Sequence, residues 1–507
     1  MTDIGEALQA RLDSAKDHDA IEVNFFLQGE PAADALAKLD APVGVANPAN
    51  TINQIKRRVQ QEHDALLDFL RSAAKEASFV DGPVKVAGAD RIQSFWITNA
   101  VAARVTRRTL DWVLNRKDVV YADLVRYVDV AELLDAGARD REPHAARARS
   151  ARASGRTDSI SAQPTWSVER INAPLLWELG LKGKDVLAAV IDTGVNYEHP
   201  DLAGQMWDGG ATHPHHGYDF AANDLDPMDQ EGHGTCCAGI VAGNGSQGQA
   251  TGVAPEARVM ALRVGGGEDA HWLALQFAID RGVHVISMSI TWKYPWHPTY
   301  PGWRRICQTI HVAGVLHANS IGNQGKELAT HPLPYNIATP GNCPPPRIHP
   351  LQTPVGGMSS AIGCGATDDS DRLADYSGRG PAAWEDALFS DYPYARGKKP
   401  GLIKPDLCAP GPGTTSCNFR FGSKGERPYT DFDGTSAATP HVAGCLALLA
   451  EACLKAGKPI IPAQIQEALE NTAARISGQT REKENHYGAG RVDVFAAYRY
   501  GQEKGWW

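Results

Sequence analysis

The sequence predicts an α/β fold with a mostly parallel central sheet flanked by helices, preceded by a small α+β unit. Residues 187–191 form an apolar run of the length and composition that buried parallel strands have. Residues 437–451 are small and apolar, which is typical of a buried helix. The short apolar stretches before residue 135 follow a different pattern, in which strands and helices alternate.

The N-terminal unit consists of five predicted elements. Residues 21–27 alternate like a strand, and residues 53–74 place apolar side chains at helical spacing. Residues 94–103 predict a central strand, residues 109–114 a helix, and residues 118–122 a final strand. This order is typical of a ferredoxin-like α+β domain.

A segment of unusual composition separates two domains. Residues 136–163 are rich in Arg, Ala and Ser and contain almost no large apolar side chains, so they cannot bury a core. We predict a flexible, protease-sensitive linker between a domain over residues 1–135 and a domain over residues 164–507. Within the second domain, the Pro- and Gly-containing stretches 323–363 and 380–401 predict surface insertions.

Length and charge limit the classes of function. The chain has 507 residues, of which 43% are hydrophobic and 21% charged, as in ordinary globular proteins. Its formal net charge of −9 gives nucleic-acid binding no electrostatic support. No apolar stretch is expected to be long enough to span a membrane, so we predict neither nucleic acid nor membrane as a partner.

Three segments, far apart in the chain, each place one reactive side chain among small residues. Residues 190–194 read Val-Ile-Asp-Thr-Gly, residues 232–235 read Gly-His-Gly-Thr, and residues 434–444 read Gly-Thr-Ser-Ala-Ala-Thr-Pro-His-Val-Ala-Gly. Any one of them alone is a common turn or helix start. Together, with Asp, His and Ser in that order and with their glycines, they resemble the segments of the subtilisin-like serine proteases, the subtilases. The resemblance extends from about residue 166 to about residue 497.

The resemblance implies a catalytic triad and a subtilisin-like fold. Ser436 would be the nucleophile, His233 the base that takes its proton, and Asp192 the carboxylate that orients the histidine. The expected reaction is hydrolysis of peptide bonds through an acyl-enzyme intermediate. The local sequence suits these roles, because Asp192 follows a predicted strand and Ser436 begins a predicted helix, near its partial positive charge.

An oxyanion-binding side chain is expected after the predicted strand that leads to residue 320. Subtilases end this strand in Gly-Asn-x-Gly, and residues 322–325 read Gly-Asn-Gln-Gly, so the resemblance assigns Asn323. Asn319 is the alternative, although it lacks the flanking glycines.

Two segments are similar to the strands with which subtilases bind peptides by β-augmentation. One holds Gly265, Gly266 and Gly267, for which the alternative is a plain flexible loop, and the other ends in Ser289, Ile290 and Thr291. The aromatic stretch 292–303 that follows is interpreted either as a rim of the substrate cleft or as a loop packed on its own domain.

No cofactor is expected for the chemistry, and a structural calcium ion is an open question. Asp201, in His-Pro-Asp-Leu, matches a calcium ligand of the family, but residues 243–249 lack much of the expected Asn pattern. The alternative is that Asp201 caps a turn.

The cysteines and the first residues indicate a compartment. Nine cysteines, an odd number without Cys-x-x-Cys pairs, favour free thiols and a reducing environment. Cys237, four residues after His233, is predicted to make the enzyme sensitive to mercurials. The first residues lack the pattern of a secretory signal, which favours a cytoplasmic enzyme or unconventional export.

The leading hypothesis is therefore a serine endopeptidase made as a zymogen. Its partners would be a protein or peptide substrate, with a dedicated precursor as one form, and its own N-terminal domain as inhibitor. The alternative from another class is a catalytically silent, peptide-binding pseudoprotease.

Overall fold

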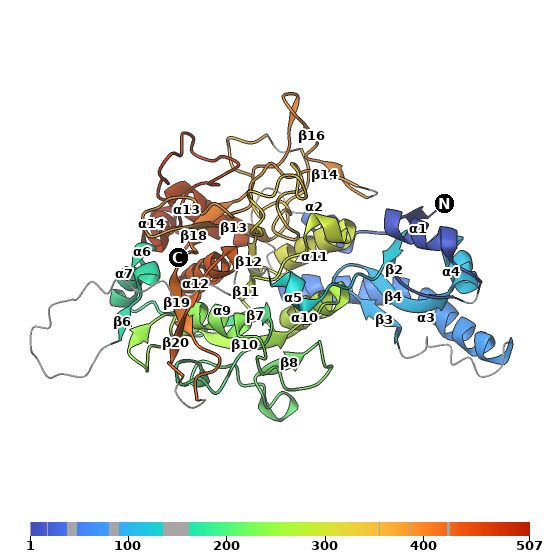
Figure 1. Ribbon diagram of the computed structural model, residues 1–507, viewed down its shortest axis with the longest axis horizontal. Helices are drawn as coiled ribbons and strands as arrows, with labels where there is room; N and C mark the ends of the chain where they lie inside the picture. Colours follow the sequence, from blue (N-terminus) through green and yellow to red (C-terminus); the bar gives the residue numbers. More distant parts are fainter. Residues whose placement is uncertain are drawn as a thin grey trace, which may run out of the picture.

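The computed structural model describes residues 2–17, 19–37, 48–80, 91–134, 162–353, 355–386, 388–422 and 426–507. The predicted linker falls almost entirely on residues 135–161, which lie outside the described residues. Figure 1 shows the smaller N-terminal domain, drawn in blue, against one side of the larger domain.

A seven-stranded sheet forms the centre of the larger domain, in the order β18-β13-β12-β11-β7-β10-β8. All of its neighbouring strands are parallel. Both faces are buried: Ala188 and Val190 belong to one hydrophobic cluster, whereas Ala189 and Ile191 belong to the other. The predicted fold class is confirmed. The strands are β7 (Leu187–Asp192), β8 (Gly217–Asp219), β10 (Arg258–Arg263), β11 (Val285–Met288), β12 (Leu316–Ser320), β13 (Ala361–Thr367) and β18 (Leu407–Pro410).

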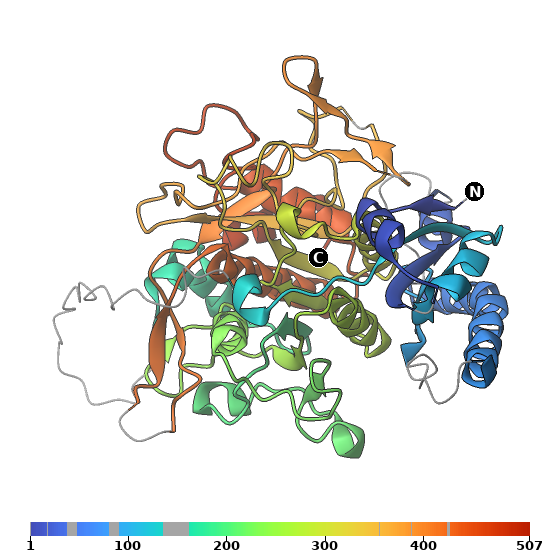
Figure 2. The same ribbon diagram turned by 45° about the vertical axis from the view of Figure 1, so that its right-hand side comes forward.

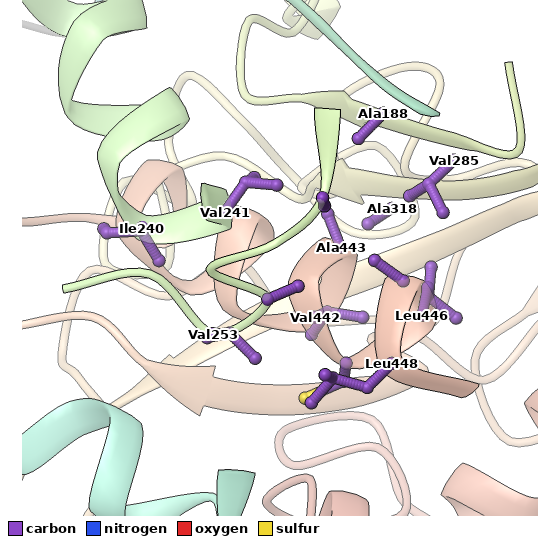
Figure 3. Packing of buried hydrophobic residues seen from close by; sticks show 14 of the residues in the cluster. Ala188, Ile240, Val241, Val253, Val285, Ala318, Val442, Ala443, Leu446 and Leu448 are labelled. Carbon is purple, nitrogen blue, oxygen red and sulfur yellow. The ribbon is translucent and has the colours of Figure 1, made fainter. Parts of the chain in front are cut away.

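Helices cover the sheet on both faces. On one face α9 (His233–Ala242) and α12 (Thr435–Lys455) pack against the strands through small and branched side chains, such as Val241, Ala443 and Leu446 (Figure 3). On the other face lie α10 (Glu268–Asp280) and α11 (Tyr300–Val312). The peripheral helices are α6 (Trp166–Arg170), α7 (Ala173–Glu178), α8 (Pro200–Ala203), α13 (Pro462–Thr472) and α14 (Val494–Lys504).

Helix α12 corrects one expectation from the sequence. By length and composition its 21 residues are sufficient to cross a membrane, so the prediction that no apolar stretch is long enough to do so is wrong. The apolar window of the helix is 94% buried inside the domain, where it forms the centre of a hydrophobic core.

The N-terminal domain has the strand order β1-β5-β2-β4-β3. Strands β5, β2, β4 and β3 pair antiparallel with their neighbours. The helices lie between the strands in the ferredoxin-like order. A short strand, β1, which the sequence did not predict, adds parallel to β5. The elements are β1 (Asp3–Ile4), α1 (Glu6–Ser14), β2 (Ala20–Leu27), α2 (Pro31–Ala37), α3 (Pro48–Val80), β3 (Gln93–Phe95), β4 (Ala100–Thr106), α4 (Arg107–Leu114), β5 (Val119–Leu124) and α5 (Val130–Leu133).

The prediction of a single strand over residues 94–103 is wrong. A turn divides this segment into β3 and β4, and in that turn Asn99 has a left-handed backbone, with φ of 52°. The amide of Asn99 donates to the carboxylate of Glu62 at 2.8 Å and to the carbonyl oxygens of Gln28 and Gly29. Asparagine tolerates this conformation because its short side chain forms such local hydrogen bonds.

This turn and the neighbouring strands dock on α10 and α11. The ring of Trp272 on α10 contacts Phe26 and Phe95, with centroids 6.1 and 5.5 Å apart. On α11, Thr309 Oγ1 donates to the carbonyl oxygen of Ile97 at 2.7 Å, and the Arg305 guanidinium donates to that of Leu27 at 3.2 Å. One hydrophobic cluster therefore continues from one domain into the other.

The two predicted insertions are only partly at the surface. Cys343 in the first, and Trp384 and Tyr392 in the second, are buried in the cluster beside α11. The described part of the second insertion forms two small hairpins. The remaining strands are β6 (Gln163–Pro164), β9 (Gln249–Ala250), β14 (Trp384–Glu385), β15 (Ser390–Asp391), β16 (Tyr394–Ala395), β17 (Lys399–Pro400), β19 (Thr414–Cys417) and β20 (Tyr429–Phe432).

Candidate active site

The reactive side chains meet at the carboxyl edge of the parallel sheet. Asp192 is the last residue of β7, and His233 is the first residue of α9. Gly232 precedes the helix with φ of 96°, a left-handed conformation that favours glycine. Gly234 is equally constrained, since a Cβ there would lie 2.0 Å from the carbonyl oxygen of Gly194. The glycines thus let the two segments pack close enough for their side chains to meet.

Asp192 and His233 form a buried pair. The distance from His233 Nδ1 to Asp192 Oδ1 is 2.7 Å, and the two residues are 6% and 0% exposed. Burial alone would lower the pKa of His233. The charge of Asp192, its hydrogen bond and the charge of Asp229 together outweigh burial and raise that pKa above its ordinary value of 6.5. With Nδ1 engaged by the carboxylate, Nε2 is the nitrogen left to exchange a proton with a nucleophile.

Asp229 is a residue of this site that the sequence did not reveal. Its Oδ1 accepts from Thr193 Oγ1 and the Gly232 N–H, both at 2.9 Å. Its Oδ2 accepts from the Thr235 N–H at 2.9 Å and from the Thr235 hydroxyl. One carboxylate thus ties the Asp192 segment to the His233 segment. An Asp four residues before the histidine was the available signal, but its bond to Thr193 joins residues 36 positions apart in the sequence.

Ser436 lies in the first turn of α12. It is 8% exposed, and Gly434 before the helix has φ of 98°. The carbonyl oxygen of Ser436 accepts from Ser289 Oγ at 3.0 Å, which places the end of β11 beside the serine. The thiol of Cys237, on α9 with His233, lies 3.7 Å from the same oxygen. The serine is therefore held between the histidine helix and the β11 segment, at the positive end of its own helix.

Of the two candidate asparagines, the structure brings Asn323 to the serine. Asn323 Oδ1 accepts from the Thr435 N–H and from Thr435 Oγ1, both at 2.9 Å. A Cβ on Gly434 would lie 3.3 Å from Asn323 Nδ2, so the amide nitrogen faces the residues just before Ser436. Asn319 lies within β12, is fully buried, and donates to the carbonyl oxygen of Ser320. Only Asn323 is placed to donate to an oxygen that develops charge near the serine.

A segment of the N-terminal domain lies on the predicted substrate strand. We call residues 125–134 the strap. The Val128 N–H donates to the carbonyl oxygen of Gly266 at 2.9 Å, and the Glu268 N–H donates to that of Arg126 at 3.0 Å. Tyr127 and Gly267 form an antiparallel bridge. A Cβ on Gly266 would lie 1.8 Å from the Val128 carbonyl oxygen, so glycine is required for this approach.

The strap then continues to the histidine. Figure 2 shows this cyan segment leaving the N-terminal domain and crossing the larger domain to α5. Leu134, just after α5, lines a cavity of about 580 Å³ together with His233, Cys236, Phe419 and Phe432. The strap therefore pairs with the Gly266 segment in a β-augmentation arrangement and ends at the cavity that the candidate catalytic base also lines.

The other predicted substrate residues follow β11 and β10. Ser289, Ile290 and Thr291 are 5%, 1% and 3% exposed. A Cβ built on Gly265 would lie 3.1 Å from the Ala221 Cβ.

The aromatic stretch 292–303 packs partly on its own domain. Trp292 and Trp303 are fully buried in the core, as the packing alternative predicted.

The residues around Asp201 do not fit a calcium ion. Asp201 is fully buried, and its Oδ1 accepts from Ser246 Oγ at 2.7 Å and from the Gln247 N–H at 2.9 Å. Its Oδ2 accepts from the Tyr429 hydroxyl at 2.7 Å. Calcium requires several oxygen acceptors around it, whereas this carboxylate is surrounded by hydrogen-bond donors.

The thiols near the site are neutral and buried. Burial raises the pKa of Cys237 well above its ordinary value, and the charge of Asp192 raises it further. Cys237 Sγ lies 3.9 Å from His233 Nδ1, whereas Cys236 Sγ points to the carbonyl oxygen of Cys417 at 3.5 Å. A mercurial on Cys237 would therefore displace the histidine, and the predicted inhibition stays a prediction.

Comparisons with known proteins agree with this geometry. A family model described as "Subtilase family" matches residues 183–490, more than half of the chain. Thermitase from Thermoactinomyces vulgaris is 30% identical over 353 residues, which cover 68% of this chain and 99% of thermitase. Serine protease AprX from Bacillus subtilis is 31% identical, over 62% of this chain and 66% of AprX. The crystal structure of fervidolysin from Fervidobacterium pennivorans has the same fold, with a TM-score of 0.58 at 18% identity, and the match covers 98% of this chain and 63% of fervidolysin.

Proposed function

The chain belongs to the subtilase family of serine proteases, and we propose that it is made as a zymogen, with its N-terminal domain as inhibitor. That the protein is a subtilisin-like serine endopeptidase follows from the family and from its relatives. The observation that carries the zymogen proposal is the strap, whose backbone pairs with Gly266 and Glu268 and whose end lines the same cavity as His233.

In the proposed mechanism Ser436 Oγ attacks the peptide carbonyl carbon while His233 Nε2 takes the hydroxyl proton. Asp192 keeps the other ring nitrogen protonated and stabilises the imidazolium that forms. The carbonyl oxygen becomes an oxyanion, to which the Asn323 amide and the Ser436 N–H donate. The C–N bond then breaks, and His233 protonates the leaving amine. Water next attacks the acyl carbon and gives its proton to His233, the bond from that carbon to Ser436 Oγ breaks, and His233 returns the proton to Ser436.

The test of the chemistry is Ser436→Ala. Because only one hydroxyl is lost, the fold should remain, while turnover of peptides should fall by roughly a million-fold. Incubation of both proteins with a peptide library, with cleavage sites read by mass spectrometry, measures this loss. Cleavage by the variant at near the wild-type rate would rule out Ser436 as the nucleophile.

The test of inhibition is Val128→Pro in the full chain. Proline removes the N–H that donates to Gly266, and it leaves the catalytic domain unchanged. We expect faster hydrolysis of a small peptide before any processing of the chain. Val128→Ala is the matched control, since it shortens the same side chain and keeps the donor. If the two variants hydrolyse the peptide equally fast, this hydrogen bond does not hold the strap in the groove.

We further propose that the enzyme works in a reducing compartment, the cytoplasm, on a protein or a dedicated precursor. All nine cysteines are free and buried, which supports this choice. Fractionation of cells that express the tagged chain tests it, and recovery outside the cell would contradict it.

A further inference from the structure

A tyrosine side chain binds the turn that leads to the nucleophile. Tyr376 lies in the loop that follows β13 and is partly buried against the core of the larger domain. Its hydroxyl donates to Asp433 Oδ1 at 2.6 Å and accepts from the Gly434 N–H at 3.1 Å. The same N–H also donates to Asp433 Oδ1, at 2.7 Å. Tyr376 and Asp433 together therefore hold the backbone of Gly434, two residues before Ser436.

The backbone around Tyr376 holds a second segment, the turn that contains Asn323. The Gly325 N–H donates to the carbonyl oxygen of Tyr376 at 2.7 Å. Two residues further along the chain, the Gly378 N–H donates to the carbonyl oxygen of Gly322 at 3.1 Å. Because Asn323 lies between the two bonded glycines, its turn is fixed at both ends along the segment that carries the tyrosine.

These two segments supply the two proposed donors to the oxyanion. A Cβ built on Gly434 would lie 3.3 Å from Asn323 Nδ2 and 3.5 Å from the Ser436 nitrogen, so both donors flank the glycine that Tyr376 binds. On the other side the segments touch directly, since the Thr435 N–H donates to Asn323 Oδ1 at 2.9 Å. The distance between the two donors is therefore set from two sides, by Thr435 and by Tyr376.

This distance matters for the rate of the reaction. An oxyanion hole accelerates the chemistry because its donors are already in place where negative charge develops. Hydrogen bonds weaken when their length and angle depart from the optimum. A small shift of one donor relative to the other therefore weakens the bonds to the transition state, whereas the bonds that hold the rest of the peptide are unaffected.

We propose that Tyr376 is a positioning residue for catalysis, whose hydroxyl holds the turn before Ser436 against the Asn323 segment so that both donors reach one oxyanion. This inference rests on the proposed function of the Asn323 amide and the Ser436 N–H as those donors. Tyr376 acts through Gly434 and Asp433, so its loss should lower kcat and leave KM unchanged.

The experiment is a double-mutant cycle of Tyr376→Phe with Asn323→Ala. Each full-chain variant is incubated until hydrolysis is steady, and kcat and KM are measured with one internally quenched peptide that the wild type cleaves. Tyr376→Phe keeps the ring that packs on the core, so the melting temperature should change little. We expect kcat to fall about tenfold, which is less than the roughly hundredfold or greater loss for a missing donor.

The second half of the cycle separates positioning from a merely structural role. In the Asn323→Ala background one donor is already absent, so there is no donor spacing left for the hydroxyl to maintain. Tyr376→Phe should then lower kcat by less than about threefold, because the two substitutions act on the same interaction.

Tyr500→Phe is the matched control. The Tyr500 hydroxyl also donates to a carboxylate, that of Glu467 at 2.9 Å, and accepts from the Asn471 amide at 3.0 Å, but it lies on the peripheral helix α14. This variant should keep the wild-type kcat.

Several outcomes would overturn the inference. They are an unchanged kcat in Tyr376→Phe, a rise in KM in place of the fall in kcat, an equal loss in both backgrounds, or the same loss in Tyr500→Phe. If Asn323→Ala alone leaves kcat unchanged, the proposed oxyanion hole itself is wrong, and this inference fails with it.

Discussion

At the scale of single residues, the site depends on donors and acceptors supplied by neighbours far apart in the chain. The Asp192–His233 pair is positioned by Asp229, and Asn323 is oriented by Thr435. Asp229 accepts hydrogen bonds from backbone N–H groups close to His233, and the backbone N–H of Thr435, next to Ser436, donates to Asn323. Changes in the neighbours should therefore alter the chemistry without removing a reactive atom.

Asn323→Ala should weaken catalysis more than Asn319→Ala. The Asn323 amide faces the residues before Ser436, so its loss removes one oxyanion donor and raises the barrier by about 3–4 kcal/mol, mostly in kcat. Asn319 is buried in β12, and its loss should appear in thermal stability instead. Steady-state kinetics and melting curves of both variants separate the effects. The reverse pattern would assign the oxyanion to Asn319.

Asp229→Asn should shift the acid limb of the pH–rate profile to lower pH. The charge of Asp229 helps to raise the pKa of His233, so without it that pKa falls and the histidine stays unprotonated in more acidic solution. The profile of kcat/KM reports this pKa. Asp226→Asn is the control, because Asp226 is in the same loop but bonds the surface hydroxyl of Tyr197. An unshifted limb in Asp229→Asn would show that its charge does not reach His233.

At the scale of elements, hydrogen bonds take the place that the family resemblance gave to calcium. The loop around Ser246 and Gln247 and strand β20 meet at Asp201, and the Tyr429 hydroxyl also accepts from the Gln249 N–H at 3.1 Å. These bonds hold the loop against the β19–β20 hairpin.

Removal of calcium should accordingly leave the melting temperature unchanged. Tyr429→Phe should destabilise the protein by about 1–3 kcal/mol, because one oxygen of the buried Asp201 carboxylate loses its donor. Tyr498→Phe, which loses a hydroxyl at the surface, should have little effect. Melting curves with and without chelator measure both. A fall in melting temperature with chelator, reversed by Ca²⁺, would contradict this account of Asp201.

The elements that the sequence predicted are those formed by local patterns. The strand before Asp192 and the helix after Ser436 were visible as uninterrupted apolar runs, and α12 indeed includes the serine in its first turn. The division of residues 94–103 was not visible, because Asn99 is held in its turn by Glu62 and by the backbone after β2. Asp229 was missed for the same reason, since its partner Thr193 is brought to it only by the tertiary fold. The burial of Tyr392 within an insertion likewise depends on distant residues.

At the scale of the whole molecule, the two domains share a core. Phe26 faces Trp272 of the larger domain and also lies beneath the guanidinium of Arg305, whereas its neighbour Phe25 points into the N-terminal domain's own core. Alternate side chains of one strand thus serve two purposes. One face holds the small domain together, and the other fastens it to α10 and α11.

This division predicts how the full chain unfolds. In a Ser436→Ala background, which prevents self-cleavage, calorimetry should show a single transition, because the shared cluster makes each domain's stability depend on the other. Phe26→Ala should split it into two, since it weakens the contact by roughly 3–5 kcal/mol while each domain keeps its own core. Phe25→Ala is the matched control: an equally buried phenylalanine is lost from the same strand, but from the inner face. It should lower the transition without dividing it. Two transitions in the unsubstituted background, or equal splitting by both variants, would show that the domains fold independently and that the strap alone holds the N-terminal domain at the groove.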